Sequence, residues 1–255
     1  MNAFTALALN GFREARRNRI TMLIAGFALL ALLMSTLLAD VSVASIERVL
    51  VDMGLAGMSL MLVVLAIFLS ATQLGKEIER RTIFMVVSKP VSRATFILGR
   101  MAGNMITLGV LLLAMTAIFW VELLVMGYPM RSQYLAAVGT LYVELLVLSS
   151  IGFALSSFAG SIVSAMVTAG IYIAGHLSGD IYRLGERAQN AFITGVAKAA
   201  YYILPQLDRL DYKPHATHLL SVSGSDAALS VAYALGYSGV MLALAVLFFS
   251  RRDFK

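Results

Sequence analysis

The chain contains no cysteine and little charge, and both shortages limit what it can be. Without cysteine, neither a disulfide nor a thiolate metal site can form. Charged residues make up 13% of the 255 residues, against about 25% in an ordinary soluble domain. Hydrophobic residues make up 60%, which leaves too little polar material to cover a water-soluble core. The composition therefore predicts a chain that lies largely in lipid.

Two enzyme motifs are also missing. The sequence has no Gly-x-x-x-x-Gly-Lys-Ser/Thr phosphate-binding loop, which excludes ATP hydrolysis by that route. It has no Gly-x-Ser-x-Gly nucleophile elbow, and the serines around His176 lack a nucleophile spacing. We expect no catalytic residue and no cofactor in this chain. The net charge of +6 comes from basic residues beside apolar runs, so we expect a membrane protein with no nucleic-acid partner.

Six apolar runs are long enough to cross a bilayer. About 20 residues at a helical rise of 1.5 Å cover the roughly 30 Å of hydrocarbon. The fourth and fifth runs are separated only by residues 159–161, which predicts a tight helical hairpin. The sequence thus predicts one all-α integral membrane domain over residues 1–255, with six transmembrane helices at 20–39, 54–74, 96–126, 135–158, 161–177 and 229–250.

Two more helical regions are predicted outside these spans. In residues 1–19, Phe4, Leu7 and Phe12 fall on one helical face and arginines on the other, as in a helix that lies along a membrane surface. Residues 178–225, between the fifth and sixth predicted spans, form a second sizeable region outside the membrane. There the apolar spacing from Ile181 onward predicts a helix that Pro205 ends.

The distribution of lysine and arginine predicts the orientation. The flanks before the first span, between the second and third together with Arg100 in the first turns of the third, and after the sixth carry 13 of them; the opposite flanks carry 7. Because positive charge gathers on the cytoplasmic side, both termini and the loop 75–94 are predicted to be cytoplasmic. Residues 178–225 are then external.

The loop 75–94 is the most polar stretch of the chain. Glu77 precedes Arg80 and Arg81 by three and four residues, a helical pair spacing. Pro90 marks a stop, and Ser92 is a candidate N-cap for the next helix. Exposed ion pairs contribute at most about 1 kcal/mol each, so stability explains the cluster poorly. Two readings stay open: a helical knob for a soluble partner, or a solvated loop that only sets topology.

The stretch 74–100, LGKEIERRTIFMVVSKPVSRATFILGR, resembles the cytoplasmic loop of ABC-2-type transporter permeases. One position differs: Arg81 stands where that family commonly has glycine. The similarity is greatest to the multicopper-enzyme-maturation branch, the nitrous-oxide-reductase accessory permeases with a type V exporter fold. The matching residues are Gly75, Glu77, Glu79, Thr82, Ser88, Pro90, Ser92, Arg93, Gly99 and Arg100.

This resemblance implies a permease subunit of an ATP-driven exporter in the bacterial cytoplasmic membrane. It implies two partners besides lipid: a second permease subunit, and a cytoplasmic ABC ATPase that binds ATP and Mg. The loop would be the coupling helix, with Glu77, Glu79, Arg80, Arg81 and Thr82 facing the ATPase and Ser88, Pro90 and Arg93 shaping the turn. A non-transporting membrane anchor and a secondary carrier are the alternatives. The substrate does not follow from the resemblance.

Acidic and small residues inside the spans are further candidates. Glu144 is about 15 Å into the fourth span, where an ionised group is costly unless it is paired or hydrated. It either lines a translocation path or is a hydrogen-bonded structural residue. Glu122, near an aromatic belt, is a weaker path candidate. Gly152, Ser156 and Gly160 repeat every four residues, which predicts close helix packing.

His215 and His218 are the remaining candidates. Two imidazoles three residues apart could bind copper or zinc. No third ligand lies nearby in the sequence, so we predict ordinary loop residues and no metal site.

Overall fold

The computed structural model describes residues 46–79, 92–188 and 190–251, with Thr5, Leu9, Met22, Ile24, residues 26–31 and Leu33; for 74–79 it describes the backbone alone. Every element in the three long stretches is helical, which confirms the predicted all-α class there. In chain order they are α3 (Ile46–Glu79), α5 (Arg93–Val125), α6 (Ser132–Ser156), α7 (Ser161–His176), α8 (Ser178–Arg187), α9 (Ala191–Ile203), the 3-10 turn η1 (Leu207–Leu210), α10 (Lys213–Thr217) and α11 (Gly224–Arg251).

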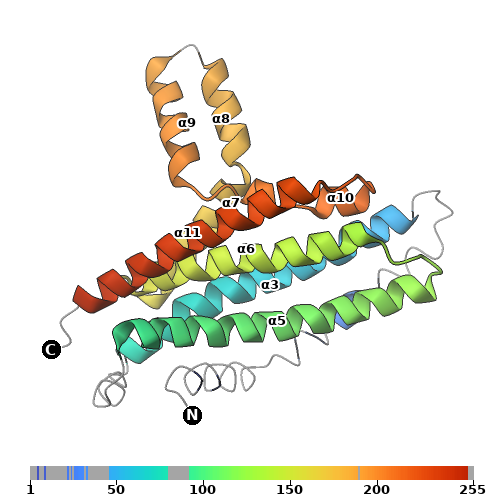
Figure 1. Cartoon of the computed structure of the whole chain (residues 1–255), viewed down its shortest axis with the longest axis horizontal. Coiled ribbons are helices and arrows are strands. Elements are labelled where there is room, and N and C mark those ends of the chain that lie inside the picture. The colour runs from blue at the N-terminus through green and yellow to red at the C-terminus, as the bar shows by residue number, and fades with distance from the viewer. Residues whose placement is uncertain are drawn as a thin grey trace.

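The long helices run side by side, and α6 lies at the centre of the bundle (Figure 1). α6 contacts α3, α5, α7, α10 and α11. Two thirds of its apolar stretch, 67%, is buried, against 17% for α11. α6 is therefore the interior helix, and α11 presents most of its surface to the surroundings.

The two ends of the bundle carry different parts of the chain. Glu79, Arg93, Ser156 and Arg251 lie where α3, α6 and α11 end and α5 begins. We call this the loop end, because the predicted coupling loop joins α3 to α5 there. The opposite end is the α10 end, toward which α10 packs against α3 and α6 (Figure 1).

Four helices in the described stretches are long and apolar enough to cross a bilayer: α3, α5, α6 and α11. They match four of the predicted spans. α7 has 16 residues and covers about 24 Å; it would make a fifth span together with α8, from which it is bent by 59°. The predicted span 20–39 and the surface helix 1–19 lie largely outside the described residues. The count of six therefore stays a prediction.

α3 begins eight residues before the predicted span, because its first turn is held by a partner far along the chain. Glu47 Oε1 accepts hydrogen bonds from Tyr134 Oη at 2.8 Å and from Arg131 Nε at 3.1 Å. The bond to Glu47 raises the pKa of Arg131 above its ordinary value. This contact joins the starts of α3 and α6, and it keeps a charged turn helical beyond the apolar run.

α8 and α9 form a hairpin that stands away from the bundle (Figure 1). The prediction of one helix from Ile181 onward is therefore wrong. α8 ends at Arg187, and Asn190 caps α9 by accepting a 2.9 Å hydrogen bond from the backbone of Phe192. The two helices pack closely at Gly185, where a Cβ would overlap that of Ala197. The predicted stop before Pro205 is confirmed, because α9 ends at Ile203.

The chain returns from this hairpin into the bundle. The side chains of Leu207, Leu210, Tyr212 and Ala216 are buried in the main core. α11 fixes the return: the Gln206 N–H donates to Tyr233 Oη at 3.1 Å. The segment 204–217 is thus an integral part of the packing, although it lies between two predicted spans.

Candidate functional site

The predicted ATPase-facing residues belong to the loop end. α3 stays helical through Glu77 to Glu79, so both acids stand on an extension of a helix long enough to cross the membrane. Their side chains lie outside the described residues, and so do five other members of the set: Arg80, Arg81, Thr82, Ser88 and Pro90. The contact of these seven residues with an ATPase stays a prediction.

Two side chains near the end of the loop, those of Ser92 and Arg93, organise the start of α5. Ser92 Oγ accepts a 3.1 Å hydrogen bond from the backbone of Thr95, which confirms the predicted N-cap. Arg93 Nη1 donates to the carbonyl oxygens of Phe249 at 2.9 Å and Ser250 at 2.8 Å. Carbonyls in the last turn of a helix lack intrahelical partners. One guanidinium therefore ties the start of α5 to the end of α11.

We expect Arg93→Ala to loosen the loop end. The change removes two charge-assisted hydrogen bonds, one part-buried and one exposed, for a combined loss of about 2–3 kcal/mol. The apparent Tm in detergent should fall by roughly 4–10 °C, measured by size-exclusion chromatography after heating. Arg251→Ala is the matched control, because Arg251 is an exposed arginine in the last turn of α11. Equal losses from both variants would contradict a specific link through Arg93.

The second candidate site lies deep in the bundle around Glu144. This residue is 12 positions from each end of α6, since 144 − 132 and 156 − 144 are both 12, or about 18 Å at helical rise. Its side chain is 1% exposed and faces α7, where His176 Nε2 lies 3.4 Å from Glu144 Oε1. Within the residues that the structure describes, these two atoms have no hydrogen bond to another group.

A chain of polar contacts leads from His176 to the α10 end. His176 Nδ1 lies 3.2 Å from the carbonyl oxygen of Tyr172, and the two rings lie at 58° to each other with centroids 4.6 Å apart. The Tyr172 side chain interacts with that of Ser59. Ser59 Oγ also lies 3.2 Å from Lys213 Nζ. We call Ser59, Glu144, Tyr172, His176 and Lys213 the polar seam.

α10 lies next to the polar seam, and side-chain contacts hold it to α3. Lys213 Nζ lies 3.4 Å from Asp211 Oδ1. One turn further on, Thr217 Oγ1 donates to Asp52 Oδ1 at 3.2 Å. Lys213 and Thr217 therefore hold α10 to α3 at two levels, through Ser59 and Asp52.

Sequence reasoning found Glu144 but missed its partners. In the sequence, His176 is notable only for the serines around it, and Lys213 is only one of the seven basic residues of the opposite flanks. A usable signal existed in α7, where Ser164, Thr168, Tyr172 and His176 recur every four residues. Residues at this spacing lie on one helical face. Such a polar stripe in an apolar helix predicts a buried polar contact, although it does not name the partner.

The other candidates lie apart from the polar seam. Glu122 is half-buried in the last turn of α5, just before the turn at Gly127. His215 stacks on the Tyr212 ring at 5.0 Å, and His218 follows α10 and is exposed. In the described part of the chain, no three residues among His, Asp and Glu gather as a metal-binding group.

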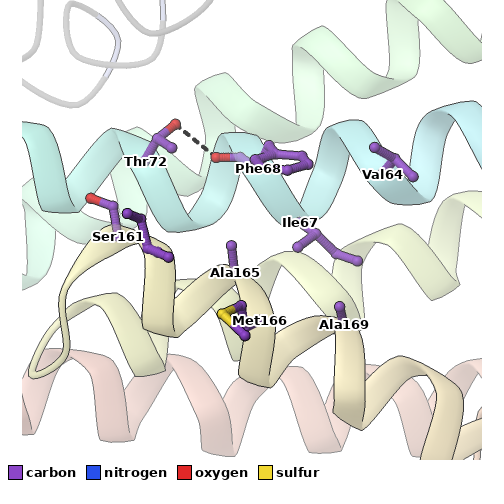
Figure 2. Close-up of a pocket in the computed structure, with 9 residues that line it drawn as sticks. Val64, Ile67, Phe68, Thr72, Ser161, Ala165, Met166 and Ala169 are labelled. Carbon is purple, nitrogen blue, oxygen red and sulfur yellow. Dashed lines mark hydrogen bonds between the residues drawn. The ribbon is translucent and has the colours of Figure 1, made fainter.

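An apolar groove of about 390 Å³ lies between α3 and α7 (Figure 2). Thr72 and Ser161 sit at one end of it, and the Thr72 hydroxyl is bonded to the Phe68 carbonyl at 2.7 Å. The rest of the wall is aliphatic or aromatic. The groove suits hydrocarbon, from a lipid or from another helix. Its main lining residues are Val64, Ile67, Phe68, Ile162, Ala165 and Met166.

These features define an all-helical, multi-pass membrane protein with a polar seam in its interior. A family model for ABC-2 family transporter proteins matches residues 5–254. The chain therefore belongs to the ABC-2 family, and it is a permease subunit of an ABC transporter. Members of this family generally work with a cytoplasmic ABC ATPase and are not themselves catalytic. No curated protein matches the chain.

Proposed function

We propose that this subunit couples ATP hydrolysis by a separate cytoplasmic ABC ATPase to export of a substrate. The observation that carries the proposal is the geometry of the loop end. A push on residues 80–91 would act on α3 directly, since α3 is helical to Glu79. It would act on α11 through Arg93, which bonds to the Phe249 and Ser250 carbonyls. The loop is thus mechanically joined to three helices: α3, α5 and α11.

The ATPase contacts assigned by the resemblance fit this arrangement. Glu77, Glu79, Arg80, Arg81 and Thr82 would enter the ATPase cleft, and Ser88 and Pro90 would turn the chain back to the Ser92 cap. ATP and Mg would be bound by the ATPase. The loop and both termini would then lie in the bacterial cytoplasm, and the α8–α9 hairpin would lie on the outer side.

A second permease subunit would complete the path. The apolar groove between α3 and α7 supports this, together with the exposed flank around it: Leu60, Ile162 and Met166 are 67%, 76% and 70% exposed. Either an identical chain or a related one could pack there. Glu122 and Glu144 would then be the polar groups nearest the path.

The substrate class depends on the branch. On the motif of residues 74–100 we place the chain with the multicopper-enzyme-maturation permeases, which favours a sulfur or metal species. The groove in Figure 2 favours an amphiphile. Mass spectrometry of small molecules that co-purify from native membrane distinguishes the two.

The decisive test is ATP hydrolysis by the purified complex. We expect the chain, isolated from native membrane, to bring down an ABC ATPase with vanadate-sensitive, substrate-stimulated activity. A co-purified ATPase whose activity no substrate stimulates would indicate a non-transporting anchor instead.

The Glu144–His176 pair favours one other function, an ion-coupled secondary carrier. Ionisable pairs inside membrane domains often mark proton or ion pathways. Transport that persists in vesicles without ATP, driven by a proton gradient alone, would support the carrier and overturn the ATP-driven exporter.

A further inference from the structure

The contact between Glu144 and His176 requires a proton of its own. The Tyr172 carbonyl can only accept a hydrogen bond, so His176 Nδ1, 3.2 Å away, must carry a proton to make that contact favourable. In neutral imidazole, Nε2 is then an acceptor. It would face the Glu144 carboxylate, another acceptor, at 3.4 Å. An additional proton, on either Nε2 or the carboxyl group, makes one of the two a donor, so that a hydrogen bond can form between them.

In the described part of the chain, no other hydrogen-bond donor satisfies the two facing atoms. Within the described residues the two facing atoms bond to no other group, and Glu144 is 1% exposed. Without the additional proton the pair would carry one negative charge in the bundle interior, which is costly unless a cation offsets it. Three charged groups act on the pair electrostatically: Lys213, Asp211 and, at His176, Asp208. Of these, Lys213 acts most strongly and is the only cation.

From this geometry we infer that Glu144 and His176 form a binding site for one proton beneath α10, and that its occupancy controls how firmly α10 is held. With the proton bound, the pair is neutral overall and attracts Lys213 weakly. When the proton leaves, the pair becomes negative and draws Lys213 onto the bundle. The inference goes beyond the proposed function, because it concerns no ATPase and no transported molecule.

The sign of the linkage follows from reciprocity. If loss of the proton strengthens the hold on Lys213, then lifting α10 must strengthen binding of the proton. Low external pH therefore favours release of α10, and high pH favours its docking. Asp211 and Asp208 oppose the effect of Lys213 and reduce its size. At Glu144 the effect of Lys213 exceeds that of Asp211, and this difference sets the sign. The side chains of Tyr172 and Ser59 lie between the pair and Lys213, and both are uncharged near neutral pH.

The absence of cysteine allows a direct test. Ala216→Cys places a single thiol on α10 at a position that is 1% exposed, and Ser221→Cys places one at an exposed position nearby. Both are reacted in intact cells with a membrane-impermeant maleimide between about pH 8 and pH 5, a range that brackets the ordinary pKa of histidine. The ratio of the two rates removes the intrinsic pH dependence of the thiol. We expect this ratio to rise at least about fivefold on acidification, as a coupling of about 1 kcal/mol requires.

Three variants test whether the rise in the labelling ratio on acidification depends on Glu144 and Lys213. Glu144→Gln cannot become negative, so the ratio should stay high and change less than about twofold with pH. Lys213→Met removes the attracted cation and should flatten the profile in the same way; it is decisive if Glu144→Gln does not fold. Glu122→Gln removes a carboxyl group of the same type outside the seam, and it should keep the full response.

Two results would overturn the inference. One is an unchanged ratio across the pH range in the parent protein. The other is a full pH response in both Glu144→Gln and Lys213→Met. If Ser221→Cys is not labelled from outside, the external placement fails, and the proposed orientation falls together with the proton site. Labelled Ser221→Cys with no pH response removes the proton site alone and leaves the exporter proposal intact.

Discussion

Reversing both acids at the end of α3, in the double variant Glu77→Lys and Glu79→Lys, is expected to abolish co-purification of the ABC ATPase. Loss of one partner of a buried, hydrogen-bonded charge pair at an interface costs about 2–5 kcal/mol, and every 1.4 kcal/mol is about a factor of ten. Reversal of two charges should therefore leave well under about 1% of the ATPase bound. The measurement is the ratio of ATPase to permease after affinity purification.

The helix geometry allows the docking side to be found. Glu77 and Glu79 are two residues apart, so they lie on opposite faces of α3. A partner that contacts one face is lost with one single variant and kept with the other. A cleft that surrounds the helix end is weakened by either. The two single variants thus distinguish a lateral contact from an enclosing one.

The matched control reverses two exposed acids at positions away from the loop end. Asp226 opens α11 and Glu186 lies on α8, so Asp226→Lys with Glu186→Lys changes the net charge by the same amount. It should leave the ATPase bound. Both double variants should insert into the membrane equally, as judged by the membrane fraction. Retained co-purification in the loop-end variant would move the docking site elsewhere.

Local chemistry explains which parts of the fold could be predicted. Long apolar runs identify helices, because an unpaired backbone cannot be accommodated in lipid. The Ser92 cap lies within three residues of its partner, Thr95, so the start of α5 could be predicted closely. The start of α3 could not, because Glu47 is held by Arg131 and Tyr134, more than 80 positions away.

The hairpin and the polar seam were missed for the same reason. The apolar spacing continues across residues 188–190, whereas contacts between α8 and α9, such as that of Gly185 with Ala197, show that the chain folds back. The depth of Glu144 follows from its position in α6, but its contacts do not. His176 is 32 residues away, since 176 − 144 = 32, and Lys213 is 69 residues away, since 213 − 144 = 69. No local pattern relates such positions.

Gly152→Leu should have the largest effect on the bundle itself. A Cβ at Gly152 would overlap Ser70 Oγ and lie 2.7 Å from Ser70 Cβ, so α6 and α3 touch there almost at backbone distance. Overpacking a core costs about 1–3 kcal/mol or more, and a full leucine side chain has no room. We expect the apparent Tm to fall by roughly 6–12 °C, or the folded protein to be lost, in size-exclusion chromatography after heating.

Gly139→Leu is the control on the same helix. Gly139 is exposed, and a Cβ there meets nothing within 4 Å. Leucine is a better helix former than glycine by nearly 1 kcal/mol, so this variant should be as stable as the parent protein or slightly more stable. A similar loss in both variants would show that glycine is needed for helix flexibility, and not for contact with α3.

A size exchange isolates the contact between the two helices. Gly152→Ala alone should destabilise the protein by about 1–3 kcal/mol, since even one methyl group overlaps Ser70. Ser70→Gly removes the hydroxyl and the Cβ that cause the overlap, so in its presence Gly152→Ala should cost nothing or be stabilising. The two changes should therefore couple by more than about 1 kcal/mol in a double-mutant cycle. Additive effects would mean that Gly152 and Ser70 are not in contact in the folded protein.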